Sequence, residues 1–381
     1  KNKFFIVQEL ISNAFDEKVS SVDIELSPLK NSRHWELMVS DDSPDGFQDL
    51  SHAYTLFAES YKKGNVKQRG RFNLGEKLAL AMFRSAKIKS TKGTVLFNED
   101  GTRTSSSKKT DSGTKFIGEI KLTEVEANNL LRECSEIIVP KGVELNVMGI
   151  SRFYEPPKFT FETSLPTIIA DEEGNLKNST QKTMVEIYPK SKDKGCIFEL
   201  GIPIVDCDID YDINVMQKVP LNKDRDNVLP SYRKKLCVEV LNRCYQDLSE
   251  NQVKDSWVKE ALESDDVSSN ATQDVLTKTH GEDAVVFDPT DPEANKKAFA
   301  DEKNVIYSNN YNKNVWLNIR KVRENSGLFK PSGSIGKYAT PKSSGGAEEL
   351  PYEKWTDGMK KVSSYAKRLH TKLFNRPLEF I

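Results

Sequence analysis

Three polar side chains near the start of the chain have the types and the spacing of a ligand-binding stripe. In "QELISNAFDE", residues 8–17, a helix of about 100° per residue places Glu9, Asn13 and Asp16 within an arc of roughly 60°. A surface helix usually has a broad polar face of mixed charge, whereas this stripe is narrow and contains no base. Carboxylates at the edge of a core are costly unless a cation compensates them. A bound Mg²⁺ would supply that cation; an ordinary amphipathic helix is the alternative.

Two later stretches have the composition of nucleotide-binding loops. In "VSDDSPDGF" (39–47) a strand runs into acids, a proline and a glycine, so that a carboxylate and exposed backbone amides can meet one ligand. In "RGRFNLGEKLALA" (69–81), Gly70, Asn73 and Gly75 lead into a predicted helix. Glycine and asparagine tolerate positive φ and let the backbone turn its amides towards phosphate oxygens. The positive end of the helix dipole favours the same anion.

These pieces, followed by a Gly-Thr pair at the head of a strand in "SGTKFIGEI" (112–120), resemble the GHKL superfamily of ATPases. The superfamily comprises gyrase-type topoisomerases, ninety-kilodalton heat-shock chaperones, sensor histidine kinases and MutL. Its first box, E-x-x-x-N-x-x-D, is matched fully by Glu9, Asn13 and Asp16. The resemblance implies that the chain binds ATP, that Glu9 is the general base activating water, and that Asn13 coordinates Mg²⁺.

The second box of the family, D-x-G-x-G, is matched only in part. Counting back from Gly46 makes Asp42 the acid that binds adenine, with Pro44 in place of the first glycine. Counting forward from Val39 makes Asp41 that acid, with one residue inserted. We prefer Asp42, because the Gly46 amide must sit near the ligand, and keep Asp41 as the alternative.

The third box, G-x-x-G-x-G, is matched with one glycine replaced by asparagine, and "GRFNLG" (70–75) lies close to the chaperone form. Thr114 matches the threonine that hydrogen-bonds in the adenine pocket. By resemblance the nucleotide contacts are Asn13, Asp16, Asp41 or Asp42, Gly46, Gly70, Phe72, Asn73, Leu74, Gly75, Lys77 and Thr114.

A second cation near the phosphates is expected, since phosphoryl transfer depends mainly on positioning and charge neutralisation. "VPLNKDRDNVLP" (219–230) resembles the chaperone middle-domain segment whose arginine reaches the γ-phosphate, which makes Arg225 catalytic. Lys218 and Lys223 are the competing choices, because gyrase and MutL use a lysine of the equivalent loop. A solvated charged loop is the plain alternative.

The predicted fold class is α/β (α+β), with helices on one face of a mixed sheet in the first part of the chain. The resemblance implies a Bergerat-type ATP-binding sandwich followed by a second α/β, transducer-like domain that ends in a helix over 231–262. The first domain is expected to lack its natural N-terminus, since residue 1 is not Met. The predicted divisions are 1–140 (ATP-binding), 141–262 (transducer or middle-like), 263–274 (linker), 275–340 (small α/β region) and 341–381 (linker and C-terminal helix).

Composition excludes several other classes of protein. The 381 residues have a net charge of −1, so no global basic field indicates nucleic acid. The five cysteines form no CxxC pair, and the four histidines are far apart, which disfavours a disulfide framework or a zinc site. No apolar run is long enough for a membrane span, and no signal peptide is present. We expect the cytoplasm of a bacterium or phage-infected host.

The expected function is Mg²⁺-dependent ATP hydrolysis, with lid closure over about 52–74 and nucleotide-dependent homodimerisation as a conformational switch. Within the superfamily, "DLSHAYTLFAESYKKGNVKQRGRFNLGEK" (49–77) looks most like phage rIIA-type ATPases. One alternative is a nucleotide-gated, chaperone-like binding protein with little turnover, for which Pro44 and Asn73 are hints. Another is a MutL-like DNA-processing ATPase, which lacks a basic stripe here. A histidine kinase is disfavoured, because no phospho-acceptor helix precedes the first box.

Overall fold

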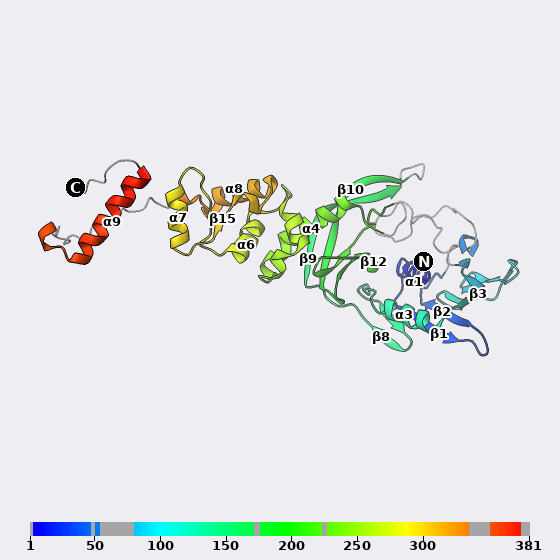
Figure 1. Cartoon of the computed structure of the whole chain (residues 1–381). Coiled ribbons are helices and arrows are strands. Elements are labelled where there is room, and N and C mark those ends of the chain that lie inside the picture. The colour runs from blue at the N-terminus through cyan, green and yellow to red at the C-terminus, as the bar shows by residue number, and fades with distance from the viewer. Residues whose placement is uncertain are drawn as a thin grey trace. The chain divides into compact units, whose positions relative to one another are not determined.

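The computed structural model describes six stretches of the chain, within two compact units (Figure 1). The first unit comprises Lys1–Glu282 and Asn309–Leu328, and the second comprises Asp283–Ser308 and Phe329–Ile381. In the described part of the chain, no helix has the length and apolar character to cross a membrane. The described residues are 3–46, 50–53, 80–170, 176–222, 227–334 and 351–374.

An eight-stranded sheet forms the first part of the first unit, in the order β5-β4-β3-β6-β2-β1-β7-β8. All neighbours are antiparallel except β1 and β7. Burial alternates along β1, where Val22, Ile24 and Leu26 point into the core. The strands are β1 (Ser21–Pro28), β2 (His34–Asp41), β3 (Phe83–Ser90), β4 (Gly93–Phe97), β5 (Arg103–Ser106), β6 (Lys115–Lys121), β7 (Glu144–Val147) and β8 (Ile150–Arg152).

Two helices, α1 (Phe4–Phe15) and α3 (Glu124–Cys134), cover one face of this sheet. Ile6 and Ile11 of α1 and Leu130 of α3 lie in one apolar core with the inward residues of β1. Both helices therefore pack on the same face of β1, as the sequence predicts. The mixed α/β character of the chain is confirmed.

A five-stranded sheet follows, in the order β12-β11-β13-β10-β9. Strands β11 and β13 are parallel neighbours and are buried along their whole length, whereas the other pairs are antiparallel. Strand β11 is largely apolar, whereas β13 buries the polar side chains of Asp212 and Asn214, which accept hydrogen bonds from the amides of Cys196 and Gly201. The strands are β9 (Phe159–Ala170), β10 (Leu176–Pro189), β11 (Gly195–Glu199), β12 (Ile202–Cys207) and β13 (Tyr211–Val215).

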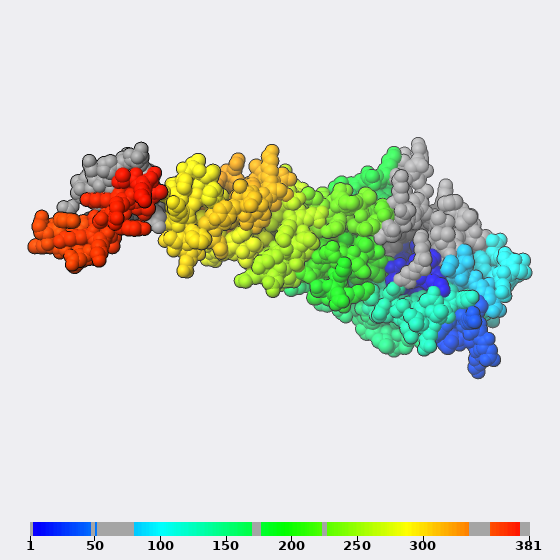
Figure 2. Space-filling model, in the orientation of Figure 1, coloured from blue at the N-terminus to red at the C-terminus, as the bar shows by residue number. Residues whose placement is uncertain are grey.

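The turn between β11 and β12 contacts the first sheet. In the space-filling view, the residues of the first sheet (blue to teal) adjoin those of the second (green) (Figure 2). The Ile138 amide donates to the Gly201 carbonyl at 3.0 Å, and Ile202 belongs to the core of the first sheet. Gly201 has a φ of +90°, and a β-carbon there would lie 2.4 Å from the Ile138 carbonyl oxygen. Only glycine fits this approach.

Helices close the second sheet and continue the first unit. They are α4 (Pro230–Cys244), α5 (Ser256–Leu262), α6 (Ser269–His280) and α8 (Lys313–Ser326). The helix predicted over 231–262 is interrupted between α4 and α5 by 3₁₀ turns at Tyr245–Asp247 and Gln252–Lys254. Short 3₁₀ turns also occur at Leu50–Ala53, Ser308–Asn310, Ser332–Ser334 and Tyr352–Lys354.

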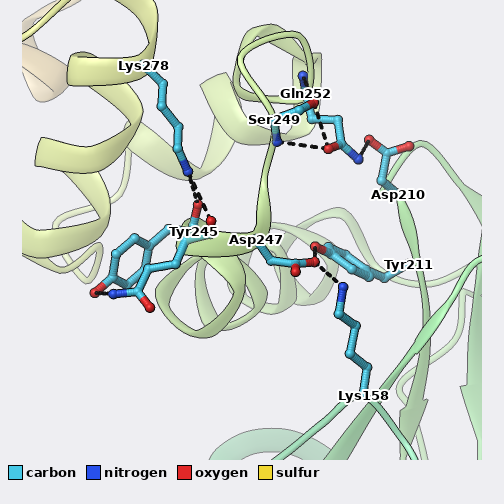
Figure 3. A network of polar contacts seen from close by, with 9 residues as sticks. Lys158, Asp210, Tyr211, Tyr245, Asp247, Ser249, Gln252 and Lys278 are labelled. Carbon is cyan, nitrogen blue, oxygen red and sulfur yellow. Dashed lines mark hydrogen bonds and ion pairs between the residues drawn. The ribbon is translucent and has the colours of Figure 1, made fainter.

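Polar contacts to the second sheet explain the interruption of this helix (Figure 3). Asp247 accepts a hydrogen bond from Tyr211 at 3.0 Å and pairs with Lys158. Gln252 donates to Asp210 at 3.1 Å. These partners are distant in sequence, so the helical period of 231–262 alone cannot reveal the break.

The linker predicted over 263–274 is wrong, because α6 begins inside it. Ser268 accepts from the Ala271 amide at 3.1 Å and caps the helix, and Thr272 is fully buried. Asn318 of α8 donates to the carbonyls of Leu262 and Ser264, both at 2.9 Å. The polar residues of this stretch cap and join helices; they do not form a solvated linker.

Other predicted boundaries also shift. Strands β7 and β8 complete the first sheet, so this sheet extends to Arg152 and not to residue 140. The pattern of 75–86 predicts a helix, but β3 begins at Phe83, so the last part of that prediction is wrong. Residues 75–79 lie outside the described part of the chain. Three short strands, β5, β8 and β13, were not predicted.

The second unit contains the small α/β region that the sequence predicts. Strands β14 (Val285–Val286) and β15 (Val305–Ile306) pair in parallel, and α7 (Pro292–Ala300) connects them. The region differs from the predicted 275–340, because α8 belongs to the first unit. Helix α9 (Asp357–Phe374) lies within the predicted C-terminal helix, whereas the predicted linker over 341–349 lies outside the described residues.

Replacing Gly201 by alanine should destabilise the first unit through the contact between its sheets. Gly142 is a matched control, since its φ is +85° and a β-carbon there meets nothing within 4 Å. Gly142→Ala should cost about 1 kcal/mol from the positive φ alone. Gly201→Ala should cost roughly 1–3 kcal/mol more, because the turn must move away from Ile138. Urea unfolding measures both; equal costs would contradict a tight contact.

Candidate functional site

The end of β2 and the start of β6 form the centre of the candidate site. Ser40 pairs with Lys115 in the register of the two strands. Immediately beyond this pair, the Asp41 amide donates to the Thr114 carbonyl at 3.0 Å, and the Thr114 amide donates to Asp41 Oδ1 at 3.2 Å. The two residues that the sequence singles out from separate boxes therefore contact each other directly.

Two glycines in the left-handed region hold the surrounding loops close together. Gly46 has a φ of +59° and Gly113 a φ of +71°. A β-carbon on Gly113 would lie 1.9 Å from the Asp41 carbonyl oxygen, a distance that no side chain allows. The carbonyl of Ser43 accepts from both glycine amides, at 3.1 Å from Gly46 and 2.8 Å from Gly113. Glycine is thus required at both positions.

A third loop reaches the same place. A β-carbon on Gly46 would meet the hydroxyls of Thr91 at 2.8 Å and Ser90 at 2.9 Å. Thr91 Oγ1 donates to the Asp45 carbonyl at 2.5 Å. The sequence pattern predicts a role neither for this loop nor for the buried Ser43. No local pattern marks Ser90 or Thr91, since their role depends on the pairing of β3 with β6.

The two adjacent acids of the second box have opposite electrostatic environments. Burial raises the pKa of Asp41 to about 6; hydrogen bonds from the amides of Ser43 and Thr114 oppose the rise, and the charges of Asp42 and Glu17 add to it. For Asp42, burial acts to raise the pKa, but hydrogen bonds from the residues after α1 outweigh it and hold the pKa below its usual value.

The oxygens of the two acids are also occupied differently. Asp42 Oδ1 accepts from the amides of Ser20 at 2.8 Å and Ser21 at 3.0 Å, and its Oδ2 accepts from the Ser20 hydroxyl. Asp41 Oδ1 accepts from the Ser43 amide at 3.0 Å as well as from Thr114. No donor to Asp41 Oδ2 is found among the residues that the structure describes. Asp42 joins the α1–β1 connection to β2, while Asp41 has an oxygen left for a ligand.

The stripe on α1 lies at the edge of the first core. Glu9, Asn13 and Asp16 are each half-buried, and Ile11 is fully buried on the same helix. Among the described residues the Asn13 side chain has no hydrogen-bond partner. Glu17, one residue past the stripe, lies near enough to Asp41 for its charge to act on that carboxyl. The C-terminal end of the stripe and the end of β2 therefore adjoin.

The remaining predicted site residues lie largely outside the described part of the chain. On either side of the segment that contains Arg225, Leu221 and Val228 form an antiparallel β-bridge. The Asn222 amide donates to the Asn227 carbonyl at 2.9 Å. Lys218 is described and is only 2% exposed. Outside the described residues lie Gly70, Phe72, Asn73, Leu74, Gly75, Lys77, Lys223 and Arg225.

The chain has a distant structural similarity to a known protein. No protein-family model matches the chain, and no curated protein matches it. Among solved structures, the chain is similar to the N-terminal domain of a DNA repair protein, with 14% sequence identity and a TM-score of 0.36 over 61% of this chain and 89% of that chain. A likeness of this size supports no conclusion about fold or function.

Asp41→Asn should stabilise the free protein at neutral pH. A carboxyl whose pKa is raised in the folded state stabilises that state below pH 4, and this contribution is lost as the pH rises towards 6. The asparagine oxygen can still accept from Ser43 and Thr114 without carrying a charge. Discounted for partial exposure, the gain is about 1–2 kcal/mol at pH 7 and vanishes near pH 4.

Unfolding in urea from pH 4 to pH 7 measures this gain. Asp42→Asn is the matched control and should destabilise the protein at pH 7, because the charged acceptor of Ser20 and Ser21 is lost. A gain for Asp42→Asn, or a loss for Asp41→Asn that does not change with pH, would contradict the assignment of the two environments.

Proposed function

We propose that this chain is a Mg²⁺-dependent ATPase of the GHKL type, in which Asp41 binds the adenine base. The observation that carries the proposal is the half-buried Asp41 carboxyl, which has one oxygen held by two backbone amides and the other free of donors among the described residues. A carboxylate so placed accepts strongly from a ligand N–H group, such as the exocyclic amine of adenine. Its raised pKa is typical of functional groups.

This choice of Asp41 replaces the sequence-based preference for Asp42. The Asp42 carboxylate already receives three hydrogen bonds from Ser20 and Ser21. Binding a base there would require breaking contacts that hold α1 to the sheet. Asp41 instead lies beside Thr114, the residue that the family resemblance assigns to the same pocket. These contacts support the alignment with one inserted residue.

The stripe of α1 supplies the groups for hydrolysis in this proposal. Glu9 is the general base that takes a proton from water attacking the γ-phosphate. Asp16 continues the stripe towards the base pocket. Asn13 fits a magnesium ligand, because it is half-buried, neutral and without a hydrogen-bond partner among the described residues, and Mg²⁺ typically takes only one or two protein ligands. When bound, the cation neutralises charge that develops on the phosphates.

The arrangement of the first unit supports the wider proposal. One sheet with α1 and α3 on a single face matches what the resemblance implies for a Bergerat-type sandwich, and a second sheet follows it as a transducer would. Arg225 is proposed as the cation that meets the γ-phosphate when lid and second sheet close. Closure would also favour pairing of two copies of the chain.

Replacement of the acid proposed to bind adenine should weaken nucleotide binding selectively. Asp41→Asn should weaken ATP binding roughly 10- to 100-fold, because a charge-assisted hydrogen bond to the amine is lost. Asp42→Asn should weaken it much less at a temperature where the variant is folded. Calorimetric titration with ATP and Mg²⁺ measures both variants, and the reverse ranking would assign the pocket to Asp42.

Loss of the base should separate turnover from binding. Glu9→Ala should lower the rate of ATP hydrolysis by roughly 10²- to 10⁴-fold while nucleotide affinity stays nearly unchanged. Glu124→Ala, which removes an exposed acid of α3, is the control and should leave both unchanged. Phosphate release and nucleotide titration measure the two effects. If the natural sequence binds ATP without releasing phosphate, a nucleotide-gated binding protein is the better description.

A further inference from the structure

The helix that carries Glu9 makes a side-chain hydrogen bond to the second sheet. Gln8, the residue before Glu9, donates from Nε2 to the Pro203 carbonyl of β12 at 2.9 Å. Gln8 is half-buried, and its partner lies 195 positions away in the chain. A rotation or an axial shift of α1 that moved Glu9 would also move the Gln8 donor. The hydrogen bond therefore fixes α1 relative to the turn between β11 and β12.

The turn itself, Glu199–Pro203, is held firmly by the first sheet. Ile202 packs in the core that contains α1, and the Gly201 carbonyl accepts from the Ile138 amide at 3.0 Å. Lys192 and Glu136 form an ion pair between the same two parts of the first unit. The turn thus moves with the first sheet, although its residues belong to the second.

On its other side, the same turn fixes the start of the segment that contains Arg225. The Glu199 side chain is buried, and its Oε2 accepts from the Val219 amide at 2.6 Å. Two more contacts tie the turn to β13, the strand that leads into this segment: the Leu200 amide donates to the Val215 carbonyl at 2.9 Å, and the Gly201 amide donates to Asn214 Oδ1 at 2.7 Å. Val219 is the first residue of 219–230.

We propose that the turn Glu199–Pro203 is a rigid connector that sets the position of Val219 relative to α1, with Gln8 as a positioning residue. One side of the connector is bonded to the helix of the proposed base, and the other to the segment of the proposed cation. The catalytic part of this inference rests on the proposed ATPase function. The mechanical part does not, because it concerns contacts within the nucleotide-free protein.

Amide hydrogen exchange tests the connector without nucleotide. Gln8→Met keeps the length of the side chain and removes its donor. It should speed exchange several-fold at the Val219 amide, which does not contact Gln8, and at the Leu200 and Gly201 amides. Exchange within α4 should not change. Gln246→Met, the same replacement at an exposed position after α4, is the control and should leave Val219 unaffected.

Turnover tests the catalytic consequence. Gln8→Met should lower kcat for ATP about two- to tenfold, the loss expected for one hydrogen bond, and leave KM and ATP affinity unchanged because the Asp41 contacts remain. Glu199→Gln weakens the other side of the same connector. The effects of the two changes on kcat should be less than additive, since either one uncouples the same parts.

The outcomes separate this inference from the proposed function. Unchanged exchange at Val219 in Gln8→Met overturns the connector, whatever the turnover. Faster exchange at Val219 in a protein that never hydrolyses ATP supports the connector and contradicts the ATPase. If Gln8→Met fails to fold, Gln8→Asn, which keeps the amide but shortens its reach, gives the same test.

Discussion

The approach of the Gly113 backbone to the Asp41 carbonyl is the constraint on which the candidate site depends. It brings the turn before β6 against the end of β2, and no β-carbon fits between them. The Asp41 amide can then donate to the Thr114 carbonyl and the Thr114 amide to the Asp41 carboxylate, while the Ser43 carbonyl accepts from both glycine amides. The carboxyl is buried by this packing and left with one oxygen without a donor in the described residues. Its position and its unusual pKa thus have one cause.

The second sheet depends on a similar approach at Gly201. There too a left-handed glycine lets two backbones touch, and the contact joins the part of the chain before residue 153 to the strands after it. Gln8 adds a side-chain bond from α1 to the same turn. Because the turn is bonded on both sides, the position of α1 and the position of Val219 are set together. A displacement of one sheet would therefore be transmitted to the other through this turn.

Local patterns predict local structure well in this chain and tertiary contacts poorly. The alternation of β1 and β2 and the apolar periods of α1 and α3 are strong because each faces one core. The break after α4 depends on Asp247 and its partner Lys158, which is far away in the sequence. The choice between Asp41 and Asp42 depends on the hydrogen bonds from Ser20 to Asp42, which the spacing of residues in the sequence does not predict. The candidate acids and Thr114 can therefore be identified from the sequence, whereas the surrounding Ser20, Ser43, Ser90 and Thr91 cannot.

The charged candidate residues on α1 and at the end of β2 are all acidic. These acids lie on α1, in the two residues after it, at the last residue of β2 and at the residue after that strand: Glu9, Asp16, Glu17, Asp41 and Asp42. Such a surface suits a base and an N–H donor, but it repels a triphosphate at close range. The cationic residues of the predicted lid (52–74) and of the segment 219–230, together with the predicted contact Lys77, are Lys62, Lys63, Lys67, Arg69, Arg71, Lys77, Lys223 and Arg225. Binding ATP would thus require both sets of charges. The acids would contact the adenine base and the attacking water, and the lysines and arginines would contact the phosphates.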